Sequence, residues 1–389
     1  MSRGLAGFLV ISVLLLTALG FVMLQSTGAY SLEGQADAMA SVSRQAAWLV
    51  LGLGVAGLLA FTDYHLLERW AWPVFWVLVV LLILCYVPGV GVTKGGASRW
   101  IAVRIPGAGN VQGQPSEVAK ITAIIGLAAW CTRFRDRRKH ILWGFIYPLG
   151  VIAVPVGLIA GEVDLGTASL IFLACAGILF LAGTRLVYMA GAVLLGGVLL
   201  GATINQIENR KARVTAFLHL DDPDVSKLKA EIKDMNYQQT QAIIAIGSGG
   251  VDGKGLGESR QKMYYLPLPH TDSVFAIVGE ELGLKGTAGV LLLFAMVGLC
   301  GMGIAIQAPD RFGKLLGFGL ISLIVGQAAI NIGVTTGCLP NKGMPLPFIS
   351  YGGSNLFSCL AAVGILLNIH RQTRLAEDDF EIHPAMAGH

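Results

Sequence analysis

The chain has 389 residues, of which 54% are hydrophobic and only 13% are charged. Soluble domains carry about 25% charged residues, so a soluble fold of this composition would leave broad apolar surface in water. The same figures exclude disordered, collagen-like and small disulfide-stapled proteins. The composition therefore predicts an integral membrane protein.

Apolar runs recur along nearly the whole sequence, and a helix that crosses a bilayer needs about 20 such residues. We predict an all-α fold with about ten transmembrane helices, at residues 5–24, 46–61, 71–87, 115–131, 141–160, 165–182, 186–204, 287–306, 312–336 and 348–369. The first run lacks a small-residue cleavage site. We therefore interpret it as a retained span and not as a secretory signal.

The Lys and Arg residues predict the orientation, because short cytoplasmic loops are enriched in them. With the amino terminus inside, the short inner segments hold 12 of these residues and the short outer loops hold 5. We therefore predict that both termini are cytoplasmic and that a large extracytoplasmic loop, about 205–272, lies between helices 7 and 8. Residues 1–375 would form a single polytopic membrane domain, and residues 376–389 a cytoplasmic tail.

Polar residues gather in four clusters, and their placement indicates where function lies, because such groups are costly in lipid. The clusters are 94–120, 162–167, the long loop 205–272, and 339–354. They suggest a substrate that is presented from the outer membrane surface.

Glu117 and Lys120 lie one helical turn apart in the first cluster. One interpretation is an ion pair at a helix end, with the lysine snorkelling to the interface. The other is a buried cation that faces the bundle interior and suits an anionic group such as a phosphate. Arg99 has the same two interpretations, and Trp100 beside it is typical of an interface anchor.

The long loop begins with a charged segment, 209–236, that we expect to be helical, followed by an apolar strip, 242–246, on or in the membrane. The glycine-rich segment 247–257 fails the spacing of a phosphate-binding loop, and we interpret it as a flexible turn region. The six cysteines lie in or beside apolar spans without paired spacing. We expect them to be core residues that form neither disulfides nor a metal site.

Asp272 ends this loop, just before an apolar helix that we expect to begin at Ser273. It is either the N-cap of that helix or a carboxylate held at the membrane boundary as a general base. His270 either tunes this carboxylate or caps the loop. We expect Glu280 and Glu281 to face a polar cavity or the outer interface. A structural role for them is at least as well supported as a functional one.

Several motifs together resemble the SEDS family (shape, elongation, division and sporulation). They read GASRWI at 96–101, QPSE at 114–117, DLGTA at 164–168, HTD at 270–272, GEELGL at 279–284 and LPFISYGGS at 346–354. Within the family, the segments at 213–218, 259–262 and 340–343 resemble the division branch, FtsW. Pro345 is similar to the elongation branch, RodA.

The resemblance implies a peptidoglycan glycosyltransferase that polymerises lipid II, a disaccharide-pentapeptide on an undecaprenyl pyrophosphate carrier. Asp272 matches the family's proposed catalytic Asp and would deprotonate the acceptor sugar. Arg99, Lys120 and Lys94 are candidates for binding the phosphates. The other residues that we assign to substrate binding are Glu117, His270, Lys342, Ser350 and Tyr351.

No cofactor is certain, and no metal site is predicted. A divalent cation, Mg²⁺ or Mn²⁺, could assist at the pyrophosphate, but no ligand cluster in the sequence requires one. The resemblance also implies two kinds of partner, a class B penicillin-binding protein that acts as transpeptidase and further division proteins. It implies that the protein lies in the bacterial inner membrane at the septum. The alternatives are a lipid II flippase or carrier, an elongation-type polymerase, and a non-catalytic scaffold.

The sequence departs from the family pattern in three places. Ser273 stands where Phe usually follows the Asp, and the stretches 103–112 and 221–234 are longer than usual. The first departure could alter packing beside the site, and the other two could change partner contacts.

Overall fold

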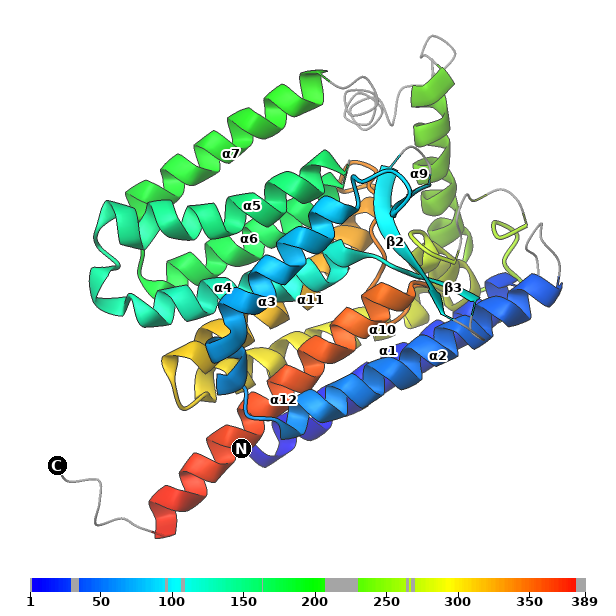
Figure 1. Ribbon diagram of the computed structural model, residues 1–389. Coiled ribbons are helices and arrows are strands. Elements are labelled where there is room, and N and C mark those ends of the chain that lie inside the picture. Colours follow the sequence, from blue (N-terminus) through cyan, green and yellow to red (C-terminus); the bar gives the residue numbers. More distant parts are fainter. Residues whose placement is uncertain are drawn as a thin grey trace.

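The computed structural model describes residues 2–28, 35–94, 97–105, 109–162, 164–206, 230–263, 266 and 270–382 (Figure 1). Each of the ten predicted spans falls on a helix. These helices are α1 (Ser2–Gly28), α2 (Gln35–Phe61), α3 (His65–Leu84), α4 (Pro115–Arg133), α5 (Tyr147–Gly161), α6 (Leu165–Ala182), α7 (Leu186–Gln206), α10 (Val274–Gln307), α11 (Arg311–Thr335) and α12 (Gly353–Ile382). Among the described residues, eight helices are long and apolar enough to cross a membrane. The chain is a multi-pass membrane protein.

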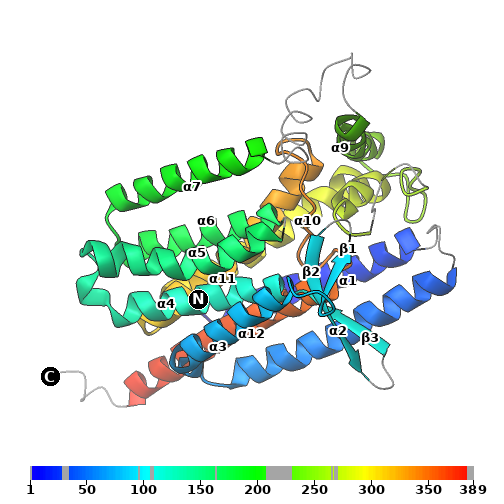
Figure 2. The same cartoon turned by 45° about the horizontal axis from the view of Figure 1, so that its top comes forward.

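The helices form one bundle in which α4, α6 and α11 are central and α7 lies at the edge beside α6 (Figures 1 and 2). Small residues let helices approach closely, as is usual where lipid replaces water. A Cβ at Gly319 of α11 would lie 2.5 Å from Ile124 of α4. A Cβ at Gly364 of α12 would lie 2.5 Å from the carbonyl oxygen of Ala56 in α2.

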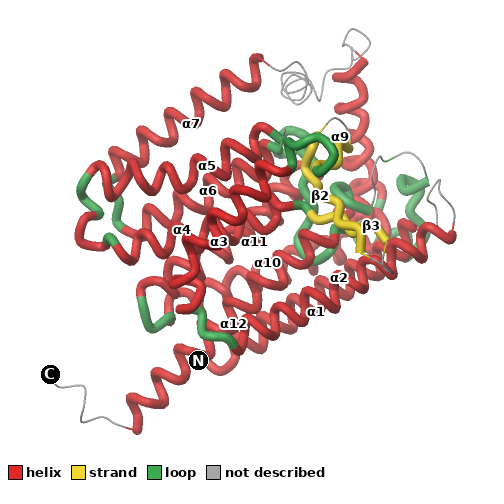
Figure 3. The backbone as a smooth tube through the Cα atoms, in the orientation of Figure 1, coloured by secondary structure: helices red, strands yellow, loops and turns green. Residues whose placement is uncertain are grey.

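The two ends of the bundle differ in character. The amino terminus and the end of α12 lie at one end, and the strands and α9 (Ala230–Ser248) lie at the other (Figure 3). This arrangement agrees with the predicted grouping of the termini, whereas the side of the membrane on which each end lies stays a prediction.

A small antiparallel sheet, which the sequence analysis did not predict, lies between α3 and α4. Its strands are β1 (Gly91–Lys94), β2 (Ala97–Ile105) and β3 (Gly109–Gly113), with β2 in the middle. In the register, Ile101 of β2 pairs with Gly91 of β1 and with Gly113 of β3. The described residues of the long stretch 103–112 therefore belong to the paired strands β2 and β3.

Helix α10 is broken at Gly283, whose φ of 65° lies outside the helical region. The glycine-rich segment fills the break. Lys254 N and Gly255 N donate to the carbonyls of Glu280 and Glu281, and Leu284 N donates to Gly250 O. These bonds pair backbone groups that the break would otherwise leave without partners, which is how irregular backbone is accommodated inside membrane proteins. Gly247 and Ser248 end α9, and the rest of the segment is a turn region, as predicted, that hydrogen bonds hold in the break.

Several predicted boundaries differ from the structure, and those of the last span differ at both ends. The last span was expected to begin at 348, but α12 begins at Gly353, because residues 347–349 form a turn in which Phe348 has a positive φ of 65°. Helix α12 continues to Ile382, so the first part of the predicted tail 376–389 is helical.

In the long loop, residues 207–229, including the longer stretch from 221, lie outside the described residues. Helix α9 holds the apolar strip, and Ala242 and Ala245 are buried against the bundle while Ile243 and Ile244 are exposed. Five of the six cysteines are buried, and Cys338 is exposed at the end of α11.

Candidate active site

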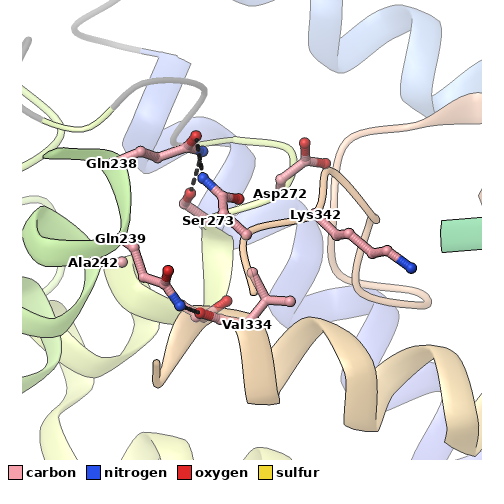
Figure 4. A pocket seen from close by; sticks show the side chains of 9 residues that line it. Gln238, Gln239, Ala242, Asp272, Ser273, Val334 and Lys342 are labelled. Carbon is pink, nitrogen blue, oxygen red and sulfur yellow. Dashed lines mark hydrogen bonds between the residues drawn. The ribbon is translucent and has the colours of Figure 1, made fainter. Parts of the chain in front are cut away.

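Asp272 lies at the rim of a hollow of about 260 Å³ between α9, the start of α10, the end of α11 and the loop that follows α11. The N-cap of α10 is Ser273, so the interpretation of Asp272 as the N-cap is wrong. The Ser273 hydroxyl accepts a hydrogen bond from Gln238 of α9 (3.4 Å), and Asn341 donates to the same glutamine (3.1 Å; Figure 4). Ser273 therefore connects α9 to the site.

The backbone on either side of the Asp272 carboxylate is fixed by hydrogen bonds from other elements. The Asp272 carbonyl accepts from Asn331 Nδ2 (2.9 Å), and the Thr271 carbonyl accepts from Ser350 Oγ (2.5 Å). The His270 carbonyl accepts from the backbone N–H of Tyr351 (2.9 Å). Three consecutive carbonyls are thus bound, which holds a partly exposed carboxylate in a defined place.

Asn331 and Ser350 also hold the loop that faces Asp272. Asn331 Nδ2 donates to Met344 O (2.6 Å), and Ser350 Oγ accepts from Leu346 N (2.8 Å). Both side chains are buried. Ser350 was predicted to bind substrate, but its hydroxyl is engaged with backbone, so its place fits a residue that positions Asp272. The Tyr351 ring lies edge-on to His270, with centroids 5.8 Å apart.

Lys342 lines the same hollow, but its ammonium group points away from the Asp272 carboxylate (Figure 4). Nζ donates to Leu165 O (3.2 Å) and to Ser169 Oγ (3.0 Å) at the start of α6. The residue therefore ties the loop after α11 to α6, and its predicted contact with substrate stays a prediction.

Lys120 and Glu117 form an ion pair of 2.7 Å, and their side chains are only 5% and 4% exposed. Lys120 Nζ also donates to Gln327 Oε1 (2.7 Å), and Ser358 donates to Glu117 (3.1 Å). The lysine does not snorkel to the interface. Lys120 is therefore a buried cation inside the bundle, as one interpretation predicted. It is also paired with Glu117, as the other interpretation predicted.

Arg99 of β2 lies against the α5–α6 turn. Its Nε donates to the Glu162 carbonyl (3.1 Å), and its Nη1 lies 4.0 Å from Asp164 Oδ2. Asp164 caps α6 by accepting from Thr167 N (3.1 Å). Lys94 belongs to β1, and its side chain lies outside the described residues.

Glu162 is a buried carboxylate that ends α5. Both of its side-chain oxygens are buried. Burial raises the pKa of this carboxyl to about 7, although the Cys85 thiol acts in the opposite direction. At neutral pH, Glu162 is therefore close to the midpoint of its titration beside Arg99.

The structure brings parts of all four predicted clusters together around the loop 339–352. A Cβ at Gly166 would lie 3.5 Å from Asp164 Oδ1, 3.0 Å from Met344 Cε and 3.7 Å from Lys342 Cδ. Gln327, the partner of Lys120, donates to Pro345 O (2.8 Å). Asp272 thus borders this loop directly, whereas Lys120 and Arg99 are connected to it through Gln327 and Asp164.

The sequence analysis missed Gln327 and Asn331, two buried amides on α11 that hold this loop. A signal was present, because they lie four residues apart in an otherwise apolar span, and polar residues in such spans are commonly functional.

Glu280 and Glu281 have structural roles. Glu280 pairs with Lys254 (2.6 Å) and accepts from the backbone of Arg260 and Gln261 (both 3.2 Å). Glu281 pairs with the fully buried Lys262 (2.9 Å). Both carboxylates fasten the long loop to the broken helix. Among the described residues, no three His, Cys, Asp or Glu side chains lie together as metal ligands would.

The sequence matches the family model of FtsW, RodA and SpoVE, described as cell cycle protein, over residues 7–375. The chain is 37% identical over 362 residues to a protein of Geobacter sulfurreducens named probable peptidoglycan glycosyltransferase FtsW, covering 92% of this chain and 93% of that protein. It is 36% identical over 373 residues to stage V sporulation protein E of Bacillus subtilis, covering 94% and 97%.

Two solved structures share the fold. A chain from a peptidoglycan synthase complex that coordinates polymerization and crosslinking aligns with a TM-score of 0.74 and 28% identity, covering 94% of this chain and 97% of that one. The rod shape determining protein RodA of Thermus thermophilus aligns with a TM-score of 0.66 and 27% identity, covering 94% and 96%. The chain therefore belongs to the FtsW/RodA/SpoVE family, as its motifs predicted.

Proposed function

We propose that this chain is a peptidoglycan glycosyltransferase of the division type, which polymerises lipid II at the outer face of the bacterial cytoplasmic membrane. The relatives named FtsW support the activity and the branch. The observation that carries the assignment of the base is the placement of Asp272, a partly exposed carboxylate whose backbone is fixed from both sides at the rim of a hollow.

In the proposed reaction, Asp272 accepts the proton of the acceptor sugar's 4-hydroxyl. The resulting oxygen nucleophile attacks the anomeric carbon of the donor, and the bond to the lipid pyrophosphate breaks with inversion. The leaving group is stable as an anion, so one positioned base and fixed cations supply the required catalysis.

Arg99 and Lys120 are the proposed cations for the pyrophosphate, with Lys94 as a third candidate. The Arg99 side chain is 22% exposed at the end of the bundle that carries Asp272, so it can meet the phosphates directly. Lys120 is buried and paired with Glu117, so it would act as a fixed charge beneath the site.

A class B penicillin-binding protein is the proposed partner, and the division septum in the inner membrane is the proposed place of action. The similarity to a chain of a synthase complex that couples polymerization to crosslinking supports such a partner. A lipid II carrier is the alternative from another class, and translocation that survives loss of Asp272 would support it.

The deciding experiment uses the protein purified with its transpeptidase partner, incubated with lipid II, and a gel that resolves glycan strands. Asp272→Asn should abolish polymer while the protein stays folded in the membrane. Asp252→Asn is the matched control, because Asp252 is a highly exposed carboxylate of the same loop. Normal polymer from Asp272→Asn would sink the assignment.

A further inference from the structure

A second hollow, of about 240 Å³, lies at the end of the bundle opposite Asp272. Its walls include Trp130 of α4, Trp143 before α5, Thr184 after α6, and two arginines, Arg138 and Arg311. The glycosyltransferase reaction uses none of these residues.

Arg311 presents a hydrogen-bond donor that no described residue satisfies. Its Nη2 donates to the carbonyl of Ala182 in the last turn of α6 (2.7 Å), which anchors the guanidinium group. Its Nε is buried and has no acceptor among the described residues. Because an unmatched buried donor is costly, this position favours an acceptor supplied from outside the protein.

Arg138 reaches the same place from the segment after α4. Its guanidinium lies 3.7 Å from where a Cβ at Gly183 would stand, and Gly183 ends α6 with a φ of 84°. Ala182, which binds Arg311, is the preceding residue. Two guanidinium groups therefore meet over the end of α6.

Cations outnumber carboxylates in these segments, which hold eight Lys and Arg residues but only Asp136 and Asp310. No ion pair within the described part of the chain involves either arginine or the nearby cations Arg133, Arg135, Arg137, Lys139, Arg185 and Lys314. The tendency of short cytoplasmic loops to carry Lys and Arg accounts for exposed cations such as Lys139. It does not account for a buried N–H without an acceptor.

The apolar side of the hollow indicates what kind of anion it takes. Trp130 and Trp143 stack with ring centroids 5.8 Å apart, and Ile141, Leu142 and Ile146 beside them are 42–47% exposed. Aromatic rings at helix ends are typical of the membrane interface, and basic pockets there bind lipid headgroups. A soluble anion would leave this apolar surface uncovered.

We propose that Arg138 and Arg311 bind the phosphate of an anionic phospholipid, with its acyl chains along residues 141–146. The phosphate oxygens accept hydrogen bonds from both guanidinium groups. Zwitterionic lipids offer the same phosphate but carry a cation that the surrounding arginines repel, so the site favours anionic headgroups.

The test measures lipid binding to the purified protein by native mass spectrometry, with phosphatidylglycerol, phosphatidylcholine and inorganic phosphate as separate probes. The double variant Arg138→Gln/Arg311→Gln should bind phosphatidylglycerol about tenfold more weakly than the wild type. The double variant Lys139→Gln/Lys314→Gln removes the same charge outside the hollow and should bind like the wild type.

If both double variants lose affinity equally, the attraction is diffuse and the proposal is overturned. It is also overturned if inorganic phosphate binds as well as phosphatidylglycerol, or if phosphatidylcholine does. Should loss of Arg311 disturb folding, Arg138→Gln alone keeps the test decisive, because Arg138 is exposed. This variant should weaken phosphatidylglycerol binding about threefold or more, and unchanged binding would contradict the proposal.

Discussion

The main chain at Gly343 passes so close to the Asp272 carboxylate that a Cβ at residue 343 would lie 2.7 Å from Oδ2. No Cβ tolerates a contact of this length, and the atom that would have to move is the end of the Asp272 side chain. The absence of a side chain at residue 343 therefore helps to set where the proposed base stands.

Gly343→Ala should reduce the polymerisation rate about tenfold or more, because small displacements of a reacting group are costly. The melting temperature should change little, since a side-chain end can shift without disturbing the backbone. Gly352→Ala is the control, as its Cβ would meet only Asn355 Cβ at 3.7 Å. Equal rates in the two variants would show that the contact does not position the base.

Ser350→Ala should lower the catalytic rate more than it changes KM for lipid II. The hydroxyl donates to Thr271 O, one residue before Asp272, so its loss frees the base without removing a substrate contact. Losing a buried hydrogen bond costs about 1–3 kcal/mol, which a melting curve will register. Ser43→Ala, at an exposed hydroxyl that bonds its own helix, should change neither quantity. A selective rise in KM would instead point to direct substrate binding by Ser350.

Lys120→Met should destabilise the protein by about 3–5 kcal/mol, because it leaves the Glu117 carboxylate buried without its partner. Adding Glu117→Gln should restore most of the stability, measured by thermal unfolding in detergent. If the cation acts on the pyrophosphate, the folded double variant stays inactive. Recovery of polymerisation in the double variant would assign the pair a purely structural role.

Glu162→Gln should change how stability depends on pH. The folded protein keeps this carboxyl protonated up to about pH 7, whereas an ordinary glutamate releases its proton near 4.5. The wild type therefore loses stability as pH rises between these values, by on the order of 3 kcal/mol at most. The variant should lose less over this interval, and Glu258→Gln, at an exposed residue, should follow the wild type. If stability changed with pH in the same way in all three proteins, the raised pKa of Glu162 would be refuted.

The positions of the ten helices could be predicted because a membrane span depends on a local run of apolar residues, which the sequence shows directly. The β1–β3 sheet was missed because its strands lie in a segment with many glycines and depend on pairing with one another. The start of α12 was misplaced because the apolar residues Phe348 and Ile349 are buried without being helical.

The family motifs led to the predictions for Asp272 and Arg99, and the polar cluster at 94–120 led to the prediction for Lys120, but neither showed how these residues are held. Asn331 acts through two backbone carbonyls from distant segments, and such contacts exist only in the folded protein. For the same reason, the N-cap interpretation of Asp272 could not be excluded until the first helical residue of α10 was known, and the general-base interpretation stays a prediction.

The break at Gly283 has a consequence for local unfolding. Residues 274–282 are tied to segment 249–262 through backbone bonds, the partly exposed pair Glu280–Lys254 and the buried pair Glu281–Lys262. Segments linked in this way open as one cooperative unit. Amide protons on both should therefore exchange with solvent at a common rate, slower than those of the exposed turns, and each opening event would release the backbone that carries Asp272.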